Sequence, residues 1–96
     1  MTYIKNQLGY TAVTSNATVA IGHHYSATNS ITLTLPAISS SVTGDEIRVK
    51  NIGSGTITID SNGSETIDGS TSNYTLDVQY SAIILVSNGS TGWEII

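Results

Sequence analysis

The amino-acid sequence predicts an all-β fold, a small antiparallel β-sandwich or barrel of the jelly-roll kind. Residues that favour strands (Ile, Val, Thr and Tyr) are abundant, and helix formers are scarce. No segment carries apolar residues at helical spacing over three turns, whereas alternation with a period of two recurs along the chain. The alternating runs are short and are separated by turns rich in Gly and Asn, which is typical of sandwiches and barrels.

Three runs show the alternation that predicts a strand with one buried face. They cover residues 31–35, 46–50 and 56–60, and Pro36 ends the first. The second and third runs are separated by a Gly-Ser-Gly turn at residues 53–55, which predicts a β-hairpin. Residues 82–86 are apolar without interruption, which predicts a strand buried on both faces. Shorter strands are predicted at residues 18–21, 65–67, 74–76 and 93–96.

Composition sets the size and class of the protein. The 96 residues suffice for one domain, which we place at residues 13–96, after an N-terminal arm at residues 1–12. With 39% hydrophobic residues the chain is not a disordered tail, although only 10% of its residues are charged. Because cysteine is absent, disulfides and thiolate metal sites are excluded.

The N-terminal arm is predicted because its apolar residues follow no clean period. Tyr3, Ile4, Leu8 and Tyr10 are irregularly spaced and Gly9 interrupts them, so an arm that docks on a partner fits this segment. An edge strand is the alternative. If the arm is correct, these four side chains are the predicted anchors of a partner-binding surface.

Unprotected sheet edges predict an oligomer. Proteins usually protect a free edge with Lys, Pro or inward-pointing charges, because an open edge invites pairing with another chain. This chain has three basic residues and one proline for about eight predicted strands. The doubly apolar segment 82–86 points the same way, since one thin sandwich covers only one of its faces. We therefore predict that another copy of the chain, or a partner, covers some of these edges.

No residue pattern predicts catalysis, a metal or a cofactor. His23 and His24 are adjacent, so in a strand they point to opposite faces and cannot share one ion. A polar loop is one interpretation of this pair, and a metal on the axis of a symmetric trimer is the other. The carboxylates of Asp60, Glu65, Asp68 and Asp77 are close in sequence, but turns and solvated faces explain them. There is no Gly-x-Ser-x-Gly motif, so we expect no enzyme and no cofactor.

Charge and hydropathy also limit the partners. The formal net charge of −4 argues against a nucleic-acid partner, which requires clustered Lys and Arg. The first eight residues lack the apolar segment of a signal peptide, and no apolar run approaches the ~20 residues of a transmembrane helix. We therefore expect no membrane partner and a protein that is made in a cytoplasm and stays soluble.

Several strings resemble a known group of proteins. Residues 44–59 read Gly-Asp-Glu-Ile-Arg-Val-Lys-Asn-Ile-Gly-Ser-Gly-Thr-Ile-Thr-Ile. Thr-Ile-Asp-Gly follows at residues 66–69, Ile-Leu-Val-Ser-Asn-Gly at 84–89 and Trp-Glu-Ile at 93–95. Over residues 30–96 the sequence resembles the β-rich modules of tailed-bacteriophage virion proteins, which occur in tail fibres, tailspikes and head decoration (cement) proteins.

The resemblance implies a homotrimer that belongs to the virion. The chain starts at Met1 without fibrous repeats, which is more like a decoration protein on the capsid surface than a fibre. Its partners would then be copies of itself and the major capsid protein, and it would be made in the host cytoplasm. The alternative is a tail-fibre or receptor-binding module that recognises a host surface glycan through loops at residues 39–43, 62–65 and 70–73.

Overall fold

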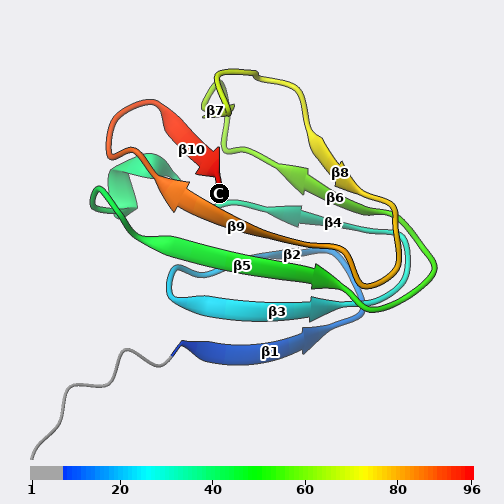
Figure 1. The fold of residues 1–96 in the computed structure, drawn as a ribbon. Helices are drawn as coiled ribbons and strands as arrows, with labels where there is room; N and C mark the ends of the chain where they lie inside the picture. Colours follow the sequence, from blue (N-terminus) through cyan, green and yellow to red (C-terminus); the bar gives the residue numbers. More distant parts are fainter. Residues whose placement is uncertain (1–7) are drawn as a thin grey trace, which may run out of the picture.

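A computed structural model describes residues 8–96, which form two β-sheets packed as layers (Figure 1). The larger sheet has the strand order β1-β3-β5-β9-β10-β7, and the smaller has the order β2-β4-β6-β8. The six strands of the larger sheet are β1 (Gly9–Val13), β3 (His23–Ala27), β5 (Glu46–Asn51), β7 (Thr66–Ile67), β9 (Ala82–Ser87) and β10 (Gly92–Ile95). The smaller sheet contains β2 (Ala17–Thr18), β4 (Ile31–Thr34), β6 (Ile57–Asp60) and β8 (Tyr74–Leu76), and one turn of 3-10 helix, η1, spans Ile38–Ser40.

The all-β prediction is confirmed, but the prediction of purely antiparallel sheets is wrong. β1, β3 and β5 run parallel to one another, and so do β2, β4 and β6. From β1 to β6 each strand lies in the opposite sheet from the strand before it, so the chain winds as a coil. Each turn of such a coil returns to its sheet in the same direction, which makes the neighbours parallel. β8 and β9 run in the opposite direction, so β8 pairs antiparallel with β6, and β9 pairs antiparallel with β5.

The hairpin predicted at residues 53–55 is also wrong. β5 and β6 lie in different sheets, so this segment crosses between the layers instead of pairing its two strands. Gly55 passes close to the neighbouring crossover, because a Cβ at this position would lie 2.7 Å from the carbonyl carbon of Asn29. Glycine at this position therefore permits two segments of backbone to approach each other. Hairpin turns also favour glycine, so the Gly-Ser-Gly sequence alone does not distinguish a crossover from a hairpin.

The core lies between the two sheets and follows the predicted alternation. Ile31 and Leu33 of β4 and Ile57 and Ile59 of β6 are buried, and so are apolar residues of β3, β5, β9 and β10. Burying one such side chain stabilises the folded state by about 1.5–3 kcal/mol. The largest fully buried side chain is Trp93 on β10.

β9 is buried on one face only, so the prediction of two buried faces is wrong. Ile83 and Leu85 point into the core, whereas Ala82 is exposed and Ile84 and Val86 are half-buried on the outer face of the sheet. The unbroken apolar run thus combines a core face with an outer face that the described chain leaves partly open.

The predicted N-terminal arm falls partly outside the described residues, since the description begins at Leu8. Residues 9–12 belong to β1, an edge strand parallel to β3, which matches the alternative interpretation for this part of the segment. No helix in the described chain is long and apolar enough to cross a bilayer.

Candidate functional site

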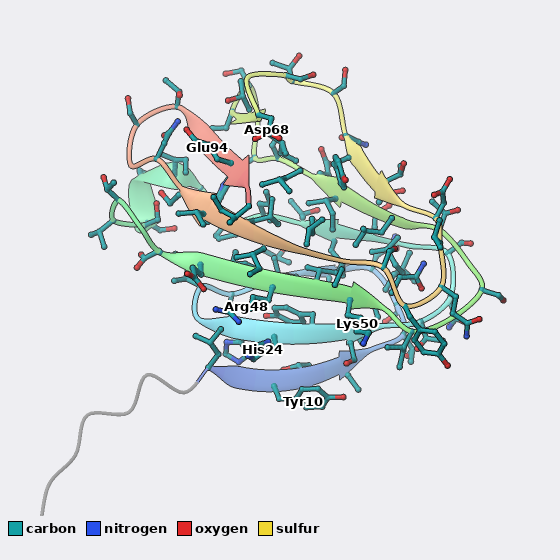
Figure 2. The ribbon with its side chains drawn as sticks, in the orientation of Figure 1. Tyr10, His24, Arg48, Lys50, Asp68 and Glu94 are labelled. Atoms are coloured by element: carbon teal, nitrogen blue, oxygen red, sulfur yellow. The ribbon has the colours of Figure 1, made fainter. Side chains whose placement is uncertain are left out.

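The outer face of the six-stranded sheet gathers side chains that are far apart in the sequence. The strand register places Tyr10 beside His24, His24 beside Arg48, and Arg48 beside Ile84. Lys50 lies two residues beyond Arg48 on the same face of β5. Figure 2 shows Tyr10, His24, Arg48 and Lys50 over β1, β3 and β5. The coil thereby brings one residue from each turn into a continuous row across the sheet.

A hollow of about 460 Å³ lies over this row, and we call it the outer-face hollow. Its walls are mostly aliphatic and aromatic, and it extends from β1 across the sheet to the C-terminal residue. It is lined by Tyr10, His24, Tyr25, Ser26, Arg48, Val49, Lys50, Ala82, Ile83, Ile84 and Ile96. Tyr10 and Ile96 are 69% and 75% exposed, so the hollow has large apolar groups at both ends. Binding sites commonly combine such apolar walls with a few placed polar groups.

Arg48 and Lys50 provide the charge of the hollow. Arg48 donates through Nε (3.1 Å) and Nη2 (2.8 Å) to Oε1 of Glu46, its neighbour on the outer face of β5. Both side chains are more than a third exposed, so this ion pair contributes at most about 1 kcal/mol and is easily exchanged for another partner. Lys50 Nζ lies 5.8 Å from the centre of the Tyr80 ring, a cation–π distance. Both cations of residues 8–96 therefore lie on one face of the molecule.

The edge of the sheet at β1 is open among the described residues. Gly9 donates its N–H to Gly22, and Val13 accepts from Thr28, so the odd-numbered residues of β1 bond toward β3. In a parallel pair the alternate residues then direct their N–H and C=O groups to the other side, which here is the free edge beside Tyr10 and Ala12.

The opposite edge of the same sheet is closed. Ile67 of β7 donates its N–H to Ser70 (2.8 Å) and accepts from the N–H of Ser70 (3.0 Å). The chain thus folds back on its own edge at β7. The sheet can accept an additional strand at β1, where the strand contains neither Lys nor Pro.

The structure locates two of the four predicted partner-binding residues. Tyr3 and Ile4 lie outside the described residues. Leu8 is half-buried just before β1, and Tyr10 is exposed at one end of the outer-face hollow. Sequence reasoning missed His24, Arg48 and Lys50 as neighbours of Tyr10, because the alternation identified their outward faces but not the parallel register that joins them.

The histidine pair lies in strand β3, so its interpretation as a polar loop is wrong. As expected for adjacent strand residues, the two rings point to opposite faces. The ring of His23 stacks on Tyr25 with 5.6 Å between centroids, and its Nδ1 atom is buried without a hydrogen-bond partner. His24 lines the outer-face hollow. Among residues 8–96 no group of three His, Asp or Glu side chains is placed to hold a metal ion.

Two of the four carboxylates considered for chemistry, Glu65 and Asp68, hold loops together. Both oxygens of Glu65 accept the backbone N–H of Ile38, at 3.0 and 3.1 Å, where η1 begins. Asp68 has a positive φ of 51° and accepts the N–H of Ile95 at 3.0 Å. These contacts match the predicted role of acidic residues in turns.

Comparison with protein-family models and with curated proteins gives no match to this sequence.

Proposed function

We propose that the protein is a non-enzymatic component of a bacteriophage virion, a capsid decoration protein that binds the outer shell as a homotrimer and stabilises it. The observation that carries the proposal is the open edge of β1 beside the partly apolar outer-face hollow. Monomeric proteins seldom leave both an unprotected edge and an apolar surface of this kind without a partner.

The two sheet edges are consistent with a closed assembly. In a cyclic trimer each interface joins two different surfaces of neighbouring copies. Since β7 is closed by Ser70, a β1-to-β7 contact cannot continue the six-stranded sheet from copy to copy into a fibre. Three weak contacts per trimer act together, and their combined affinity can exceed that of one contact by about 10²–10⁴.

The resemblance to virion modules covers residues 30–96 and so leaves out the N-terminal strands of the fold. The resembling strings contribute to β5, β6, β7, β9 and β10, whereas β1 and β3 precede them. We therefore assign the capsid contact to the N-terminal side of the molecule, with Tyr3, Ile4, Leu8 and Tyr10 as anchors. The proposed partners are other copies of the chain and the major capsid protein, at the capsid surface, with no cofactor, nucleic acid or membrane.

Cosedimentation with capsids of the parent phage that lack this protein tests the proposal. The full chain is expected to pellet with the capsids, and electron microscopy should place its copies at three-fold positions on the shell. Deleting residues 1–8 removes three anchors but keeps β1, and it should abolish binding while the protein remains folded and trimeric. Absence of the full chain from the capsids would reject decoration, whereas unchanged binding of the shortened chain would reject only the assigned anchors.

One observation favours a second candidate, a receptor-binding module for a host glycan. Two of the loops predicted for that role, residues 39–43 and 62–65, lie near each other, because Glu65 accepts the N–H of Ile38, the residue directly before the first loop. Ser41 also contacts Ser87 at 2.7 Å, which ties the end of β9 to the same rim. Copies at the tail of the virion, together with glycan binding that is lost on substitution in these loops, would favour this function over decoration.

A further inference from the structure

We propose that the outer-face hollow binds an extended acidic segment of a partner protein, with a carboxylate held by Arg48 and Lys50 and aliphatic side chains against Ile84 and Ile96. This inference rests on the proposed function, because it specifies the chemistry of the partner surface that the module contacts. Charge and shape support it, and the Glu46–Arg48 ion pair provides a test of it.

Charge favours an anionic partner at this place and disfavours it elsewhere. The chain has seven acidic and three basic residues, and its formal net charge is −4. Arg48 and Lys50 both line the hollow, whereas the acidic residues of the same sheet face, Glu46 and Glu94, are not among its lining residues, and Asp68 lies near β7 (Figure 2). An acidic segment is therefore attracted to the hollow and repelled by much of the remaining surface. Such complementarity fixes where a partner binds more than how tightly it binds.

The shape of the hollow fits an extended polypeptide. The hollow crosses the strands from β1 to the residue after β10, and four inter-strand spacings of ~4.8 Å make a length of ~19 Å. About six residues of extended chain at ~3.3 Å each cover this distance. Arg48 lies near the middle, with Tyr10 toward one end and Ile96 toward the other.

The aliphatic walls favour a peptide over a sugar. Ala82, Ile84 and Ile96 offer surfaces for aliphatic side chains, whereas a glycan is usually held against exposed aromatic rings. Tyr10 is the one tyrosine of the lining that is well exposed, since Tyr25 is buried. An alternating segment with apolar, acidic and apolar side chains on one face matches this sequence of surfaces.

The ion pair of Glu46 with Arg48 leads to a prediction that is specific to this proposal, namely that removing the Glu46 charge strengthens binding. Its carboxylate occupies Nε and Nη2 of Arg48, so it competes with an incoming carboxylate for the same guanidinium. Replacing Glu46 with Gln keeps the shape of the side chain but removes the competing charge. The variant should therefore bind an acidic segment more tightly, although it loses an ion pair of its own.

Titration of the ¹⁵N-labelled full chain with the peptide acetyl-Ile-Thr-Glu-Thr-Ile-amide tests the site, with Gln and Lys analogues of the peptide as controls. The Glu peptide should shift amide signals of β3, β5 and β9 and bind at least about fivefold more tightly than the Gln peptide. R48Q/K50Q should weaken its binding about tenfold, and E46Q should strengthen it about threefold. The control S72E/N73D changes the net charge by the same amount as R48Q/K50Q in an exposed loop, and it should leave the affinity within about twofold.

Four results would overturn the inference. The first is equal affinity for the Glu, Gln and Lys peptides, and the second is a set of shifted signals outside the outer-face hollow. Stronger binding of a uronic-acid oligosaccharide of equal charge would assign the hollow to a glycan. A smaller sedimenting mass of R48Q/K50Q would assign it to contacts between copies of this chain.

Binding to capsids separates this inference from the proposed function. If R48Q/K50Q binds undecorated capsids as the full natural sequence does, the hollow is not the contact and decoration stands. If the natural sequence binds the Glu peptide but no capsid, decoration is rejected and the peptide site stands.

Discussion

Asn51 shows how one buried amide holds the crossover between the two sheets. Its side chain is fully buried, and its Nδ2 donates to the carbonyl oxygens of Gly55 (2.8 Å) and Leu76 (3.0 Å). Its Oδ1 accepts the N–H of Gly53 at 3.0 Å. The amide thus satisfies three backbone groups at the place where the sequence indicates a simple hairpin. A period-two pattern carries no information about such a contact, because Asn51 follows the alternation as an ordinary inward residue.

We expect Asn51→Ala to lower the free energy of unfolding by about 3 kcal/mol, since it leaves backbone groups without partners in a buried place. Urea denaturation followed by Trp93 fluorescence measures the change. Asn73→Ala is the matched control, because Asn73 is exposed, and it should stay within about 0.5 kcal/mol of the natural sequence. Equal stabilities of the two variants would contradict the assigned role of Asn51.

At the level of elements, the sequence predicts which face of a strand is buried better than it predicts which strands pair with each other. The inward positions of β4, β5 and β6 are those that the alternation indicates. Strand direction and sheet membership are not encoded in a period of two, so the parallel coil and the crossing at residues 53–55 could not be predicted from it. The outer face of β9 was predicted incorrectly for a related reason, since an apolar run does not reveal whether a second layer covers it.

The two faces of β9 should respond differently to truncation. Leu85→Ala removes a fully buried side chain from the core and should cost about 3 kcal/mol of stability. Ile84→Ala acts on the half-buried outer face and should cost less than about 1.5 kcal/mol. Chemical denaturation of both variants measures the difference. A larger loss for Ile84→Ala than for Leu85→Ala would mean that the outer face is covered within the folded chain.

Proline substitution distinguishes the two sides of β1. The N–H of Thr11 bonds toward β3, so Thr11→Pro should cost about 2 kcal/mol through a lost ladder hydrogen bond. The N–H of Ala12 points to the free edge, so Ala12→Pro should remain folded with a loss below about 1 kcal/mol. Under the proposed assembly, Ala12→Pro should also weaken self-association, because it removes a donor from the open edge. Similar denaturation midpoints for the two variants would contradict the assigned register.

At the level of the whole molecule, the candidate site arises from winding. Tyr10, His24 and Arg48 come from successive turns of the coil, and only their parallel register makes them neighbours. Sequence reasoning predicts Tyr10 as a contact residue and indicates the outward face of β5, but it cannot join them without the register. The open β1 edge is likewise visible only when both edges of the sheet are known.

The central claim is that one copy of this chain leaves surfaces that further copies and a partner cover. Sedimentation equilibrium of the purified full chain at micromolar concentration tests it most directly. We predict a mass of about 30 kDa, three times the 10.0 kDa of one chain. A constant mass of 10.0 kDa across the concentration range would contradict the account.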